Sequence, residues 1–151
     1  MLRSKAVIAN SPIVDLRRYM LGLVGGGEED AAHRVAGCRR HARRRGCARA
    51  EAVVQGVLPR FGVTSLAQWI ERLKTFNAVQ VLGRLSCPAL ALVGTGEGDE
   101  AHQQFETFCS RMFGPATQRV FEVAEGADMH CQVGNLPRSN AVVYDWLEET
   151  L

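Results

Sequence analysis

Short apolar runs bounded by turn-forming residues recur along the chain. Residues 6–9 form the first run, which ends at Asn10, and residues 90–93 form the second; residues 120–123 form a third, which includes Glu122. Continuous apolar runs of this length are typical of strands that are buried on both faces of a parallel sheet. We therefore expect three buried strands at these positions.

Between and after these runs, apolar residues recur at the spacing of one helical face. Thr64 or Ser65 can cap a helix that follows it, and Asn135 can cap the last one. Helices are expected in residues 16–23, 101–112 and 137–151, with two more within residues 51–76 that are joined near residues 59–64.

The alternation of strand and helix predicts an α/β fold with about three parallel strands and flanking helices. The chain has 151 residues, of which 46% are hydrophobic, so a single globular domain is the default expectation.

Polar residues with catalytic potential follow the second and third predicted strands. The second strand leads into the glycine-rich stretch VGTGEGDE, which carries Glu97 and Asp99, and the third leads into EGADMHCQ, which carries His130. Imidazole can act as a general base near neutral pH, and a carboxylate can hold its tautomer. Asp128 is close to His130 in sequence, but that spacing is more typical of a polar loop.

These stretches resemble the C-terminal half of an α/β-hydrolase, in the branch that includes the fermentation-respiration switch protein and 2,6-dihydropseudooxynicotine hydrolase. An acid after one strand and a histidine after the next is the order of that family. The resemblance is carried by residues 5–20, 61–77, 87–100 and 119–147, about half of the chain.

The resemblance implies a partial α/β-hydrolase fold that acts on esters, amides or activated carbon–carbon bonds of a small-molecule substrate, without a cofactor. His130 would be the catalytic base. Glu97 is favoured as the acid because it follows Gly94 by three residues, and Asp99 stays open because aspartate is the commoner type. The implied regions are residues 1–24 (first strand and helix), 25–84 (helical cap) and 85–151 (C-terminal strand-helix-strand-helix half).

The nucleophile of such an enzyme sits in a G-x-S-x-G turn, and none of the six serines has flanking glycines. Ser11 follows a predicted strand, but Pro12 occupies the place where the turn needs a free amide. We therefore expect a truncated, inactive hydrolase that begins just after its nucleophile. The alternative is a non-catalytic interaction protein that associates, for example as a homo-oligomer, through an exposed sheet edge or an arginine-rich segment.

That segment, residues 31–50, holds seven arginines and no acid, although the net charge of the chain is only +2. It could bind nucleic acid through its guanidinium groups, but it lacks interleaved aromatic residues, so a solvated face of the cap is favoured. GC-rich coding sequence read out of frame would give a similar composition.

Cofactor, metal and membrane sites are not expected. The five cysteines form no C-x-x-C pair and reproduce no zinc spacing with the histidines. A dinucleotide fingerprint would need a third glycine where Asp99 stands. The chain has no signal-peptide core and no apolar run of roughly 18 residues, so we expect a cytoplasmic protein with no membrane association.

Overall fold

The computed structural model describes residues 4–24 and 56–151. The predictions for the arginine-rich segment, Cys38, Cys47 and the start of the 51–76 region fall outside this part of the chain. The chain forms two compact units, Met1–Val14 with Ala78–Leu151 and Asp15–Asn77. Each unit is described separately below.

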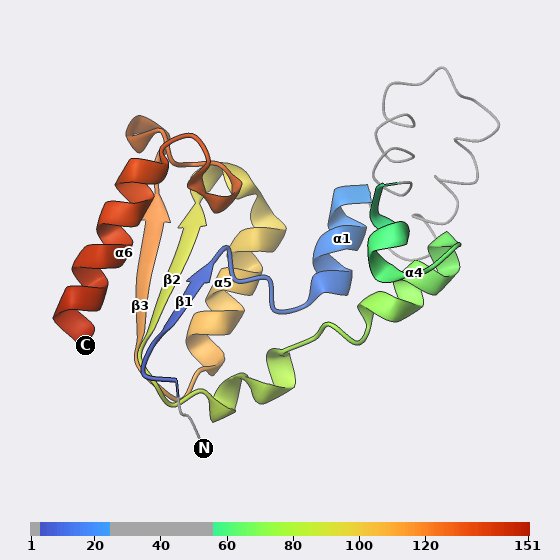
Figure 1. Cartoon of the computed structure of the whole chain (residues 1–151), viewed down its shortest axis with the longest axis horizontal. Coiled ribbons are helices and arrows are strands. Elements are labelled where there is room, and N and C mark those ends of the chain that lie inside the picture. The colour runs from blue at the N-terminus through green and yellow to red at the C-terminus, as the bar shows by residue number, and fades with distance from the viewer. Residues whose placement is uncertain (1–3, 25–55) are drawn as a thin grey trace. The chain divides into compact units, whose positions relative to one another are not determined.

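The first unit contains a parallel three-stranded sheet in the order β1-β2-β3 (Figure 1). Its strands are β1 (Val7–Asn10), β2 (Ala89–Gly94) and β3 (Ala116–Phe121). Val7 pairs with Ala89, and Ala89 pairs with Ala116. The predicted α/β fold with three parallel strands and flanking helices is confirmed.

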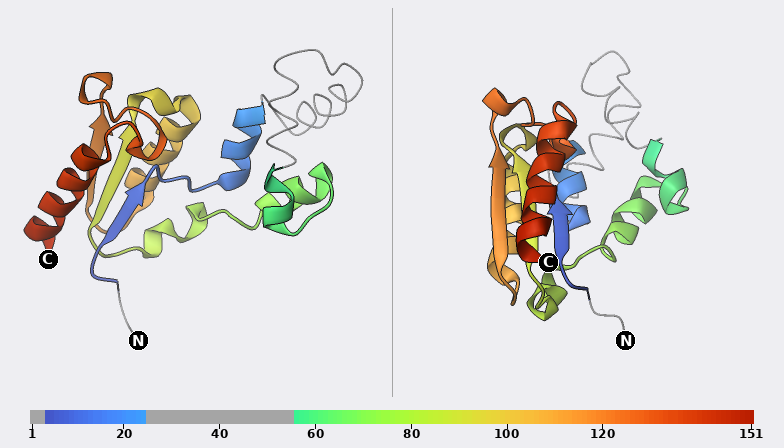
Figure 2. Two further views of the ribbon diagram at one scale, coloured as in Figure 1. Left: turned by 45° about the horizontal axis from the view of Figure 1, so that its top comes forward. Right: turned by 60° about the vertical axis from the view of Figure 1, so that its left-hand side comes forward.

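Strand β2 forms the centre of the core because both of its faces are covered. Figure 2 shows α5 (Asp99–Arg111) and α6 (Leu136–Thr150) on opposite faces of the sheet. Leu90 and Leu92 pack in one cluster with Trp146 of α6, and all six residues of β2 are buried. Burial on both faces explains why β2 reads as a continuous apolar run.

Strand β3 begins earlier than its apolar residues predict. The predicted range was 120–123, whereas the strand covers Ala116–Phe121 and Val123–Glu125 forms a 3-10 turn, η4. Among the described residues β3 pairs only with β2, and Thr117 and Gln118 are exposed. The first half of this outer strand therefore has no hydrophobic pattern by which it could be recognised.

The helix caps follow from the sequence. Ser65 accepts a hydrogen bond from the Gln68 amide at the start of α4 (Leu66–Leu73), and Asn135 accepts one from the Arg138 amide at the start of α6. Three further 3-10 turns lie in the first unit: η2 (Val79–Arg84), η3 (Thr95–Glu97) and η5 (His130–Gln132).

The second unit has its own small core. Helix α1 (Leu16–Val24) contributes Leu21, and α4 contributes buried residues that pack with it. The ends of the unit meet at a bridge between Asp15 and Asn77, whose side-chain amide donates to the Asp15 carboxylate at 2.9 Å. A 3-10 turn, η1 (Pro59–Phe61), precedes α4. In residues 4–24 and 56–151, none of the helices combines the length and apolar character needed to cross a bilayer.

Candidate functional site

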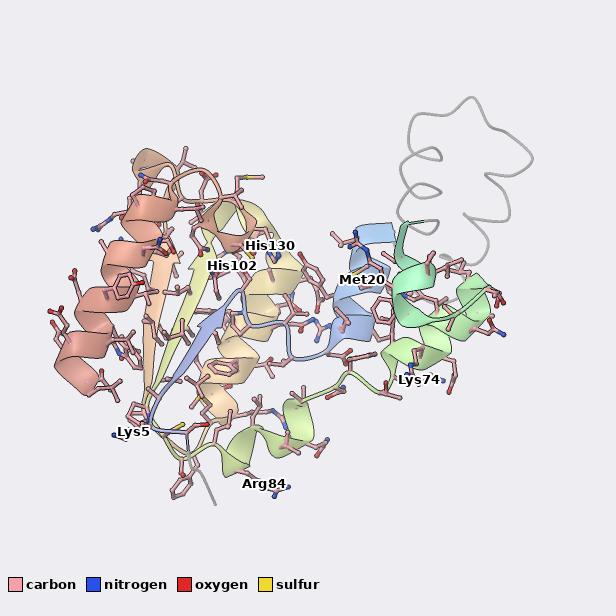
Figure 3. All side chains as sticks on the ribbon, viewed as in Figure 1. Lys5, Met20, Lys74, Arg84, His102 and His130 are labelled. Carbon is pink, nitrogen blue, oxygen red and sulfur yellow. The ribbon has the colours of Figure 1, made fainter. Side chains whose placement is uncertain are left out.

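Three polar side chains meet at the carboxyl edge of the sheet. Ser11 follows β1 directly, Glu97 lies in the turn η3 after β2, and His130 lies in the longer loop after β3. Because neighbouring parallel strands end at the same edge, residues that are distant in sequence come together there. His130 is labelled near this edge in Figure 3.

The central contact joins His130 and Glu97. His130 Nδ1 lies 2.7 Å from Glu97 Oε2. The Glu97 side chain is 0% exposed, whereas the His130 side chain is 53% exposed. An ionised carboxylate only accepts hydrogen bonds, so the proton of this contact belongs to Nδ1. In the neutral ring, Nε2 is then the nitrogen that accepts a proton.

The buried carboxylate has further hydrogen-bond donors. The Gly94 amide donates to Oε1 at 2.8 Å, and the Ser11 hydroxyl lies 2.8 Å from Oε1 and 2.6 Å from Oε2. The side-chain amide of Gln132 is a more distant donor to Oε1, at 3.5 Å. A carboxylate that is removed from water requires donors of this kind.

Two glycines allow the histidine loop to approach the acid turn. A Cβ atom on Gly94 would lie 2.1 Å from the carbonyl oxygen of Asp128, and one on Gly96 would lie 3.0 Å from the same oxygen. The Gly96 amide donates to that oxygen at 2.9 Å. The glycine spacing that superficially resembles a phosphate-binding fingerprint therefore accommodates the backbone of the histidine loop.

An ion cluster holds the base of the same loop. Glu125 Oε1 contacts the guanidinium of Arg119 on β3 and lies 3.1 Å from Nε of Arg138 on α6. The Asn135 side chain donates to the Glu125 carbonyl at 2.8 Å. The pKa of Glu125 lies below its ordinary value, chiefly because the carboxylate accepts the Glu122 amide, with further contributions from Arg138 and Arg119. The loop is thus tied to elements on both of its sides.

Three residues of the site have left-handed backbone conformations that non-glycine residues seldom adopt. Ser11 has φ 52°, Cys131 has φ 55° and Gln132 has φ 52°. Such conformations cost free energy, and they are found where the surrounding structure enforces them. Burial, and secondarily the charge of Glu97, raise the pKa of the Cys131 thiol, so it is poorly suited to act as a thiolate nucleophile.

The other predicted acids are placed differently. Asp99 is the first residue of α5, where a carboxylate interacts favourably with the helix dipole. Asp128 contributes its backbone carbonyl to the contact with Gly96. The carboxylate bonded to His130 Nδ1 is that of Glu97. Among residues 4–24 and 56–151, no group of three or more histidine, cysteine or acidic side chains could hold a metal ion.

Sequence reasoning missed the roles of Ser11, Gln132 and His102. The Nε2 atom of His102, on α5, lies 3.1 Å from the Gly94 carbonyl and so supports the end of β2 (Figure 3). The sequence alone indicates Ser11 only as a candidate nucleophile, because it follows a predicted strand. Its position directly after a strand that neighbours β2 was the available indication that it lies near Glu97.

No family model matches the chain, and a search of the curated proteins finds no match.

Proposed function

We propose that Glu97 and His130 form the acid–histidine part of a hydrolase site of the α/β-hydrolase type. In this proposal Glu97 holds the Nδ1–H of His130, and Nε2 takes a proton from an attacking hydroxyl and returns it to the leaving group. The substrate class is a small-molecule ester, amide or activated carbon–carbon compound.

The observation that carries the proposal is the 2.7 Å contact between a half-exposed imidazole and a fully buried carboxylate. A surface ion pair would leave both partners in water. Here the acid is shielded and held by donors from its own turn, while the imidazole reaches solvent, as the partner that exchanges protons with a substrate must. The position of both groups at the carboxyl edge of a parallel sheet adds support.

We further propose that these 151 residues do not hydrolyse esters through a serine of their own. Ser11, which reaches the pair, directs its hydroxyl to the Glu97 carboxylate, whereas a nucleophile would be bonded to the histidine. The Ser139 side chain is buried within α6, and the Ser110 hydroxyl lies 3.4 Å from the Thr107 carbonyl on α5. The attacking hydroxyl of the proposed reaction is therefore not among these serines.

Two measurements test the two parts of this proposal. Proton NMR of the purified chain in water should show a downfield Nδ1–H resonance that disappears in both His130→Ala and Glu97→Gln. Absence of this resonance from the wild-type chain would refute the proposed acid–histidine pair. For the second part, a fluorophosphonate probe should label no serine, and p-nitrophenyl acetate should show no saturable turnover. Saturable turnover that is abolished by His130→Ala would refute the second part alone.

The open edge of β1 supports a second candidate function, association with another chain. Among the described residues β1 pairs only with β2, and Ile8 is 40% exposed. An edge strand presents unpaired backbone groups that can accept a further strand. We expect concentration-dependent association in light scattering after size exclusion, and its reduction by Ile8→Lys. A wild-type chain that stays monomeric at every concentration would exclude this function.

A further inference from the structure

We infer that Ser11 is a positioning residue that holds the Glu97 carboxylate in the orientation that His130 requires. This inference rests on the proposed function, because it assigns Ser11 a role in the same acid–histidine pair. Ser11 lies 86 positions before Glu97 in the sequence, and its hydroxyl lies within 2.8 Å of both carboxylate oxygens.

The reason for such a residue lies in the flexibility of glutamate. The last torsion of its side chain is broad and roughly two-fold, so one hydrogen bond does not fix the plane of the carboxylate. The Gly94 amide contacts Oε1 only, and His130 contacts Oε2 from a half-exposed side chain. Ser11 contacts both oxygens from the end of a sheet strand, so it sets the carboxylate plane without relying on the half-exposed imidazole.

The backbone of Ser11 is adapted to this contact. Its amide donates to the Leu92 carbonyl at 2.8 Å, which continues the pairing between β1 and β2. The chain bends at Ser11, directly after β1, where φ is 52°. The residue is only 6% exposed. A serine that is this deeply buried, and that is bonded to the acid and not to the histidine, is poorly placed to attack a substrate, so this geometry favours positioning over attack.

The test compares two substitutions that remove the hydroxyl but treat the backbone differently. Ser11→Ala keeps a side chain at a positive φ, whereas Ser11→Gly relieves that conformational cost. Ser110→Ala is the matched control, because it removes an exposed serine hydroxyl from α5. The readout is the Nδ1–H resonance of His130 and its rate of exchange with water, in the whole chain. A purely structural role of Ser11 would not change this readout in a folded variant.

We expect both Ser11 variants to lose the resonance, or to exchange the Nδ1 proton with water at least about tenfold faster. The reason is that a hydrogen bond to a charged group stabilises the bonded arrangement by more than about tenfold in its equilibrium constant. Ser110→Ala should match the wild type. If Ser11→Ala does not fold, Ser11→Gly decides the question. A folded Ser11→Gly with wild-type resonance and exchange would overturn the role of Ser11 alone, whereas a wild-type chain without the resonance would overturn the proposed function itself.

Discussion

Replacing Gly94 by alanine should separate the histidine loop from the acid turn. The added Cβ would lie 2.1 Å from the Asp128 carbonyl oxygen, 2.4 Å from the carbonyl carbon and 2.9 Å from Cα. All three atoms are backbone, so no side-chain rotation relieves the contact. The φ of Gly94 is −100°, which alanine adopts freely. The substitution therefore acts through steric overlap, with no contribution from backbone strain.

The size of the displacement follows from these distances. Ordinary contact begins at 3.4 Å, so the 2.1 Å approach requires a movement of about 1.3 Å. His130 is two residues beyond Asp128, and its Nδ1 is 2.7 Å from the carboxylate. A shift of that size takes the pair outside hydrogen-bonding range. Overpacking of this kind costs about 1–3 kcal/mol of stability.

The assay combines urea unfolding with the Nδ1–H resonance of His130. Gly94→Ala should unfold at lower urea and lose the resonance. Gly83→Ala is the matched control, because its Cβ would lie 3.8 Å from its nearest neighbour, the Arg111 carbonyl, which is ordinary contact. That variant should keep the resonance. A stable Gly94→Ala variant with an unchanged resonance would show that the loop does not rest on this glycine as described.

Three further outcomes are expected. Glu97→Asp should shorten the side chain away from its donors, lose the Nδ1–H resonance and cost about 1–3 kcal/mol in urea unfolding; retention of the resonance would contradict this. Glu125→Gln should lower the free energy of unfolding at neutral pH. The lowered pKa of Glu125 stabilises the folded chain above the ordinary pKa of 4.5, and this stability is lost as the pH falls through the lowered pKa. The difference in stability from the wild type should therefore vanish in strong acid. A difference that persists in acid would refute that origin. Burial, and secondarily the charge of Glu97, raise the pKa of the Cys131 thiol, so Glu97→Gln should remove the smaller contribution and speed alkylation of Cys131 by iodoacetamide at mildly alkaline pH. Peptide mass spectrometry measures the rate of alkylation, and an unchanged rate would contradict this prediction.

The strands differ in how far the sequence predicts them, and burial explains the difference. Strand β2 is covered on both faces, so its pattern is purely apolar and its position follows from the sequence. Strand β3 is an outer strand with an exposed polar half, and only its pairing with β2 reveals where it starts. The last helix was predictable to within one residue, because Asn135 provides a local cap.

The proximity of His130 and Glu97 could be predicted from the sequence, whereas the contact of Ser11 with Glu97 could not. His130 and Glu97 are separated by 33 positions, and the rule that neighbouring parallel strands end at one edge predicts their proximity. The contact of the Ser11 hydroxyl with Glu97 could not be predicted in the same way, because Ser11 adopts a positive φ where it makes this contact. No local pattern in the sequence encodes that conformation at a serine.

The choice between Glu97 and Asp99 shows how local backbone geometry selects a residue that spacing alone leaves ambiguous. The chain forms one 3-10 turn after Gly94, and a glutamate at its end reaches back to the Gly94 amide at 2.8 Å. Two residues later α5 begins, and its first turn places Asp99 at the positive end of a helix dipole. The side chain at position 97 must therefore be long enough to reach back from the turn to the edge of the sheet. At that edge the loop that carries His130 packs against Gly94.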